Sequence, residues 1–164
     1  MSGDPSTASR SSARTGRAET TSAILAAALA RVAASGADGC SLPRVADDAG
    51  ISTGPLYSRF DSPDDLIAAL WDTELSAHLD LLFATAADWL AGPGDEPPAL
   101  LVAELDRPSP RSQAVVEVLA ALRRHPYAAE TVRIDVAAAL EAFEARLVDR
   151  PPVVASYCLA AMLG

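Results

Sequence analysis

The sequence predicts an all-α protein in which a three-helix helix-turn-helix head precedes an antiparallel helical bundle. Apolar residues recur at helical spacing along most of the 164 residues, and no segment shows convincing strand alternation. Prolines and glycines mark the ends of the periodic segments, and the hydrophobic half of the residues is enough for a core. We expect a flexible N-terminal arm (1–16), a head (17–62) and a bundle (63–164).

The first periodic segment predicts a helix over 17–35. Leu25, Ala28 and Val32 recur on one face, and Gly36 can close the helix. The chain before it is rich in Ser, Thr, Ala and Arg, which is typical of a flexible polar tail.

Two short helices with a tight turn between them follow. Ser41 can cap the first, which holds Pro43 in its first turn, and Gly50 can end it in a left-handed conformation. Ser52 offers a second N-cap, so a helix over 53–59 follows. Such a pair, whose second helix presents small polar residues, forms a helix-turn-helix.

A long helical pattern begins at Ser62. This serine can cap a helix that has Pro63 at its first position and Asp65 three residues after the cap. The apolar face continues to Leu90, so we expect two helices with a bend near 76–78, ended by glycines and a proline at 92–94.

The remaining periodic segments predict four further helices with proline-marked boundaries. A short helix covers 98–105, and another runs from a cap at Ser109 to about Arg124. A third starts at Pro126 and is stopped by the prolines at 151 and 152, and a last apolar helix covers 153–163. Helices with short connections form a bundle.

The charge is unevenly distributed. The net charge is −9. Residues 1–60 hold six arginines and five acidic residues, whereas residues 61–164 hold seven arginines and seventeen acidic residues. The negative charge would keep the body away from DNA phosphates while the head docks. The alternative is that these charged side chains only solvate the helix faces.

Composition also bears on compartment. Cys40 and Cys158 lie far apart and form no metal-ligand pair, which suits free thiols in a reducing cytosol. The N-terminus lacks an apolar signal core, and the longest uncharged run, 151–164, is shorter than the roughly 20 residues of a membrane span. We expect a cytoplasmic protein without a membrane partner.

The head residues also have a specific spacing. A generic helix-turn-helix would not require Leu56 and Tyr57 followed by Phe60 and then a capped long helix. The pattern comprises Ile24, Leu25, Ala27, Ala28, Leu29, Gly36, Val45, Ala46, Ala49, Gly50, Ile51, Ser52, Gly54, Leu56, Tyr57, Phe60, Ser62 and Leu66. Residues 17–70 therefore resemble the TetR family of bacterial transcriptional repressors. The acidic helical remainder looks like the family's ligand-binding and dimerisation domain.

Several positions depart from the family's usual residues. Thr53 stands where Lys is frequent, Pro55 where Thr is frequent, and Pro63 where Lys is frequent; Ser58 and Arg59 replace a pair that commonly includes His. Two cationic phosphate contacts are thus missing, which predicts lower DNA affinity or a larger contribution from the arm arginines.

The chemistry of the head suggests which residues touch double-stranded DNA. Helix N-termini at Ser41 and Ser52 favour an anion, and Tyr57 shares a helix face with Thr53. We expect the remaining candidates to contact phosphates or base edges, or to let the backbone approach DNA closely. The predicted DNA-binding residues are Arg14, Arg17, Ser41, Arg44, Ser52, Thr53, Gly54, Pro55, Tyr57, Ser58 and Arg59.

Each of these assignments has an alternative. Tyr57 can be a partly buried core residue, Arg44 an ordinary solvated arginine, and Gly54 a glycine without a role at DNA. The arm can equally be an inert tail.

The resemblance implies a homodimer on a palindromic operator and an unknown small-molecule effector inside the bundle. Candidate pocket residues are Trp71, His78, Phe83, Trp89 and Tyr127. A dimer seam is predicted at Val132, Val136, Leu140, Phe143 and Leu147. Both sets can instead be internal core.

Two other functions compete with this one. Catalysis is disfavoured because His78 and His125 are the only neutral-pH bases, and Glu74 and His78 lack the i, i+3 spacing of di-iron bundles. We expect no enzyme activity, metal or cofactor. A helix-turn-helix that has lost DNA binding and serves as a protein-interaction module is the second alternative.

Overall fold

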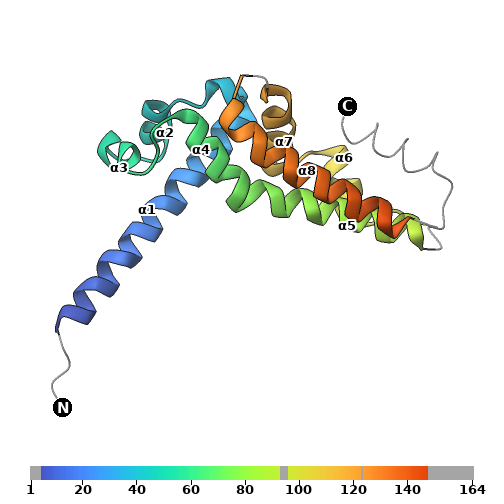
Figure 1. The fold of residues 1–164 in the computed structure, drawn as a ribbon, viewed down its shortest axis with the longest axis horizontal. Coiled ribbons are helices and arrows are strands. Elements are labelled where there is room, and N and C mark those ends of the chain that lie inside the picture. Colours follow the sequence, from blue (N-terminus) through green and yellow to red (C-terminus); the bar gives the residue numbers. More distant parts are fainter. Residues whose placement is uncertain (1–4, 93–95, 123, 148–164) are drawn as a thin grey trace, which may run out of the picture.

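The computed structural model describes residues 5–92, 96–122 and 124–147, with side chains described from residue 16 onward except at 126 and 127. Every regular element in these ranges is helical, which confirms the predicted all-α class (Figure 1). None of these helices combines the length and apolarity that crossing a membrane requires.

The first helix is longer than predicted. α1 spans Pro5–Ser35, and its N-terminal half projects away from the other helices (Figure 1). The expectation of an arm outside the helix up to residue 16 is therefore wrong for the backbone from Pro5 onward. The local sequence permits this extension: no proline lies between residues 6 and 35, and the Ser, Thr and single Gly16 lower helix propensity without breaking the helix. Gly36, at φ 75°, closes α1 as predicted.

The head contains the two short helices that the capping pattern predicts. After the 3₁₀ turn η1 (Ala37–Gly39), α2 spans Leu42–Asp48 and α3 spans Thr53–Tyr57, with Ser41 and Ser52 as N-caps. Gly50 takes φ 66°, the left-handed conformation expected of it between the helices. The second helix ends two residues before the predicted Arg59.

The head continues into one long helical connector. α4 (Pro63–Leu70), the π-helical turn η2 (Trp71–Leu75) and α5 (Ser76–Ala91) follow one another without a loop. At the start of α4 the hydroxyl of Ser62 accepts a hydrogen bond from Asp65 N at 3.1 Å, and Ser62 N donates to Asp65 Oδ2 at 2.9 Å. This reciprocal pair is the predicted capping box.

The connector changes geometry earlier than predicted. The expected bend at 76–78 is replaced by the π turn, where Trp71 and Leu75 are fully buried. The indole Nε1 of Trp71 donates a 2.8 Å hydrogen bond to Asp135 Oδ2 of the last described helix. A contact between residues so distant in sequence leaves no trace in the local apolar pattern.

Three further helices complete the body. α6 spans Ala99–Asp106, α7 spans Pro110–Ala121 and α8 spans Pro126–Arg146. The Ser109 hydroxyl caps α7 as predicted, although α7 ends before Arg124. The predicted stop at 151–152 and the last helix at 153–163 lie outside the described residues.

Buried side chains of the head and body form one continuous core. α1 packs against α4 and α7, and α8 packs against α4 and α5. The predicted boundary at Ser62 and Pro63 therefore marks the start of α4 without separating two cores.

The apolar seam of α8 is used inside the chain. Val132, Phe143 and Leu147 are buried, and Val136 and Leu140 are partly buried against the same core. Phe143 also contacts Phe83 of α5 edge to face, with ring centroids 5.6 Å apart. Val132, Phe143 and Leu147 therefore belong to the internal core, whereas Val136 and Leu140 are only partly covered, and the dimer seam stays a prediction.

We predict that Ser62→Ala lowers the free energy of unfolding by about 1 kcal/mol, because it removes a capping hydrogen bond at the start of the connector. Urea unfolding followed by far-UV circular dichroism measures this change. Ser52→Ala is the matched control: Ser52 is also an N-cap, but its side chain makes no capping hydrogen bond. Equal destabilisation by the two substitutions would contradict the role of the capping box.

Candidate nucleic-acid interface and effector groove

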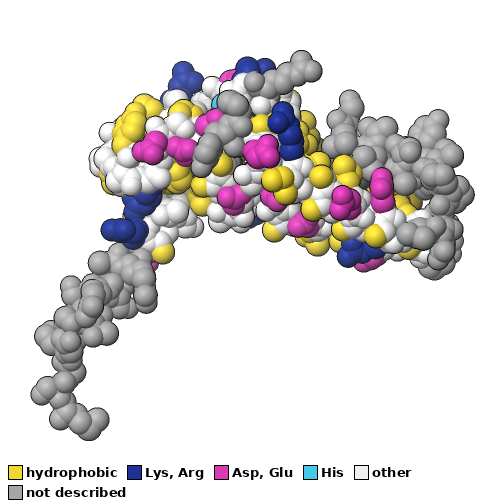
Figure 2. Space-filling model, in the orientation of Figure 1, with side chains coloured by type: hydrophobic (Ala, Val, Ile, Leu, Met, Phe, Trp, Pro, Cys, Tyr) yellow, Lys and Arg dark blue, Asp and Glu magenta, His cyan; other side chains and the backbone are white. Residues whose placement is uncertain are grey.

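α3 presents a polar, uncharged face to solvent. Ser52, Thr53, Gly54 and Ser58 are exposed, and Tyr57 is 53% exposed. Leu56, on the opposite side, is fully buried and anchors α3 in the head. The tip of the head over α3 is mostly free of charged side chains in Figure 2. Both Tyr57 and Thr53 are thus accessible to a partner.

The N-termini of the two short helices keep their donors accessible. Neither Ser41 nor Ser52 makes a side-chain capping bond, and Ser52 is exposed. First-turn amide groups of a helix carry partial positive charge, which favours a phosphate oxygen.

Gly54 has no packing reason to be glycine. A Cβ at this position would meet no atom within 4 Å, and its φ is not positive. Pro55, half-buried beside it, lies in the first turn of α3, where a missing N–H breaks no helical bond. A surface that comes close to the backbone here would benefit from the absent side chain.

The arginines predicted to contact DNA have different environments. Arg44 on α2 and Arg17 on α1 are exposed. The backbone of Arg14 belongs to α1, but its side chain lies outside the described ones.

Arg59 is committed to contacts within the head. Its Nη1 donates to Pro55 O at 2.7 Å, its Nε donates to Thr21 Oγ1 at 3.2 Å, and its Nη2 lies 3.5 Å from Arg17 O. The half-buried guanidinium therefore ties α3 to α1 and fixes the position of α3.

An ion pair fixes α2 against α1. Arg31 donates to both carboxylate oxygens of Asp48, at 2.6 and 2.7 Å. The pairing reduces the negative charge that α2 would otherwise place beside α3.

Charged groups also join the head to the start of α8. His125 Nδ1 contacts Asp64 Oδ1 in the first turn of α4, and its Nε2 lies 3.4 Å from Asp38 Oδ1 in η1. Arg124 Nε donates to Asp38 at 2.9 Å, and this hydrogen bond is the main cause of the lowered pKa of Asp38. The beginning of α8 is thereby fixed to both ends of the helix-turn-helix.

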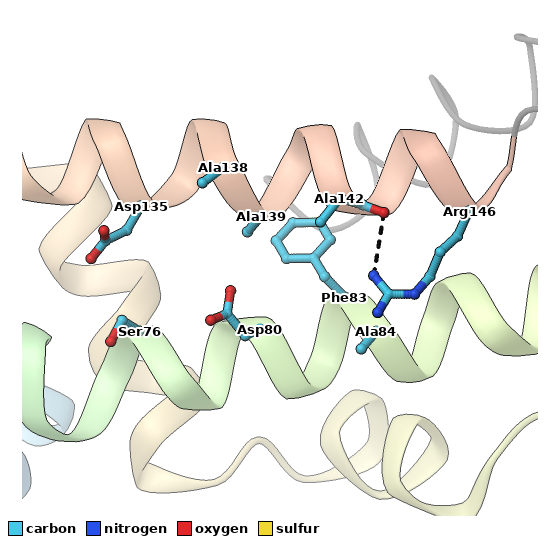
Figure 3. Close-up of a pocket in the computed structure, with 9 residues that line it drawn as sticks. All are labelled: Ser76, Asp80, Phe83, Ala84, Asp135, Ala138, Ala139, Ala142 and Arg146. Atoms are coloured by element: carbon cyan, nitrogen blue, oxygen red, sulfur yellow. Dashed lines mark hydrogen bonds between the residues drawn. The ribbon is translucent and has the colours of Figure 1, made fainter.

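A groove of about 460 Å³ lies between α5 and α8 (Figure 3). Phe83 and small side chains form its walls, Asp80 and Asp135 lie toward one end, and Arg146 lies toward the other. The lining residues are Ser76, Asp80, Phe83, Ala84, Asp135, Ala138, Ala139, Ala142 and Arg146.

Of the aromatic and histidine residues predicted to line a pocket, Phe83 alone is among those lining this groove. Trp71 is buried in the core, and Trp89 is half-buried on α5. His78 Nε2 is 2.8 Å from Ser112 Oγ of α7, and burial lowers the pKa of His78. The side chain of Tyr127 lies outside the described ones.

The carboxylates of the groove were missed by sequence reasoning. The lining positions of α5 and of α8 each repeat at three- or four-residue spacing, so they share one face of each helix. The sequence shows a helix face made of small residues with single carboxylates, but a search for aromatic pocket residues does not select such a face.

Cys40 has the environment of a core residue. It is 2% exposed, and burial raises the pKa of its thiol to about 11. At neutral pH the thiolate needed for nucleophilic catalysis is therefore scarce. Within the described part of the chain, no three His, Cys, Asp or Glu residues are grouped so that they could hold a metal ion.

Comparison with protein families gives one match. Residues 24–70 match the family described as bacterial regulatory proteins, tetR family. These residues include α2, α3 and α4 together with the C-terminal part of α1 from residue 24 to 35. Neither the curated proteins nor the solved structures gave a match.

We predict that Arg59→Ala lowers the free energy of unfolding by about 1–2 kcal/mol, because it removes hydrogen bonds from a half-buried guanidinium. Arg44→Ala removes the same charge from an exposed site and should change the free energy of unfolding by less than about 0.5 kcal/mol. Thermal and urea unfolding of the two variants measure the difference. Comparable losses would show that Arg44 also supports the fold.

We also predict that Cys40 stays unlabelled by an aromatic disulfide reagent in the native protein and reacts fully in denaturant. The measurement uses a Cys158→Ser background, so that Cys40 is the thiol observed. Rapid stoichiometric labelling of the native variant would contradict the burial of this side chain.

Proposed function

The head of this chain belongs to the TetR family of bacterial regulatory proteins, and we propose that this DNA-binding transcriptional regulator is a ligand-responsive repressor. It binds a palindromic operator as a homodimer and acts in the cytoplasm. Binding of a small-molecule effector in the body releases it from DNA.

The exposed face of α3 carries the proposal. In this reading α3 enters the major groove and offers Thr53 to a base edge and the Tyr57 hydroxyl to a phosphate. Gly54, which nothing within the chain requires, allows the backbone to approach DNA closely. Arg44 and Arg17 supply cationic contacts at the flanks.

The uncharged recognition face limits the electrostatic part of the affinity. Each neutralised phosphate steepens the logarithmic salt dependence of binding by about 0.9 for duplex DNA. Since Arg59 is engaged within the head, few cations remain for phosphates, and the salt dependence should be shallow.

Operator recognition requires two heads, because a single head reads only a few base pairs. Since Val132, Phe143 and Leu147 are buried within the chain, the homodimer forms through side chains other than these three. An effector changes DNA binding when it favours the orientation of the heads that does not fit the operator.

Selection of bound sequences from a random duplex pool, using the full chain, tests the function. The proposal predicts enrichment of an inverted repeat, with half-sites separated by about one helical turn or a multiple of it. A single unrepeated site would overturn the homodimer. Absence of enrichment at both low and moderate salt, with the fold intact, would favour a protein-interaction module.

Variants then test the interface itself. We predict that Arg44→Ala and Tyr57→Phe each weaken operator binding by at least about fivefold, since each removes a hydrogen bond worth about 1 kcal/mol or more, while the melting temperature changes little. Fluorescence anisotropy with the selected duplex measures the affinity. Arg107→Ala, an exposed arginine of the body, is the matched control. Unchanged affinity in Tyr57→Phe would exclude this face of α3, and unchanged affinity in Arg44→Ala would exclude the flanking contact from α2.

A further inference from the structure

We propose that the effector is a small organic cation with a compact apolar body, held in the α5–α8 groove by Asp80 and Asp135, where it competes with Trp71 for Asp135. This inference rests on the proposed function and names the ligand class and the residue through which the ligand acts.

The shape and walls of the groove suit a compact apolar body. Its volume of about 460 Å³ is in the range of small-molecule sites. Phe83 lies between the two helices, and alanines line the facing walls (Figure 3). Phe83 is 3% exposed, so it and the alanine methyl groups offer an apolar wall with dispersion contacts.

The charges of the groove favour a cation. Asp80 and Asp135 come from facing helices, whereas the opposing charge of Arg146 at the far end is already engaged. Arg146 Nη1 donates to Ala142 O at 3.3 Å, and its Nε lies 3.6 Å from Asp88 Oδ1. A ligand therefore meets two carboxylates at one end and a paired guanidinium at the other.

Asp135 links this groove to the connector. The same carboxylate that lines the groove accepts the hydrogen bond from Trp71 Nε1 at 2.8 Å. A cationic donor forms a stronger hydrogen bond with a carboxylate than a neutral indole does, so a cation that binds at Asp135 Oδ2 displaces the indole from that oxygen. The indole N–H, buried in the core, is then left without its acceptor.

The π turn can convert this competition into movement of the head. Trp71 begins η2, the five-residue π segment between α4 and α5. π turns within α-helices are frequent at functional sites, and a change of such a turn to α geometry rotates the segment before it relative to the segment after it. Here the segment before it is α4, which starts directly after the helix-turn-helix.

The binding test uses primary aryl and alkyl ammonium ions, whose N–H groups can donate to a carboxylate, with neutral carbon analogues of the same shape and with arylsulfonates. Calorimetry and thermal shift of the full chain without DNA measure affinity. We expect at least one cation to bind about tenfold or more tightly than its neutral analogue, consistent with a charge-assisted hydrogen bond or ion contact. If no cation exceeds its neutral analogue, or if the sulfonates bind best, the inference is overturned.

Variants locate the site. Asp80→Asn and Asp135→Asn should each lower the affinity for the cation about tenfold, and the asparagine at 135 retains an oxygen that can accept from Trp71. Asp106→Asn, the same charge change on exposed α6, is the control and should leave affinity unchanged. Equal effects of all three variants would show nonspecific attraction and contradict the site.

Trp71→Phe tests the competition. Without the indole N–H, Asp135 is released, so the cation should bind several-fold more tightly while releasing DNA less effectively. In a Trp89→Phe background the emission of Trp71 should shift on binding, because its hydrogen bond changes. Unchanged affinity in Trp71→Phe, with no spectral shift, would refute the link. Since cation binding is measured without DNA, a failure of DNA binding and a failure of this inference are separate results.

Discussion

The packing of α1 against α4 and α7 is the contact on which the rest of the structure depends. Ile24, Ala28 and Val32 are fully buried on one side of α1, so the helix that supports the head is also part of the body core. α2 and α3 take their positions from that helix, through Leu56 and through the guanidinium of Arg59. A head with its own core could turn freely on a linker, whereas this one is oriented by the body.

Because α1 belongs to both head and body, it holds α3 in a fixed position. α3 has no charged residue, and an arginine near it is used to hold the helix in place. In the proposed function, discrimination between DNA sequences rests on shape, on hydroxyl groups and on a fixed orientation of α3. The acidic body is spread with carboxylates on the face shown in Figure 2, which disfavours contact of the body with phosphates.

The sequence predicted what short-range rules determine and missed what distant contacts determine. The caps at Ser62 and Ser109, the left-handed Gly50 and the all-α class follow from local chemistry, and the structure has them, whereas the hydroxyl of Ser52 makes no capping bond. The π turn at Trp71 and the internal use of Phe143 depend on partners more than fifty residues away. Arg59 was expected to contact DNA because the sequence shows its charge. The sequence does not show that this side chain has hydrogen-bond acceptors on α1.

The central claim is that head and body form one cooperative unit joined through α1 and the connector. Native-state hydrogen exchange in rising guanidinium, resolved by residue, tests it most directly. The account predicts that the most protected amides of α2 and of α8 reach the same opening free energy and the same denaturant dependence. Exchange of α2 through a separate opening at lower denaturant, with α8 still protected, would contradict it.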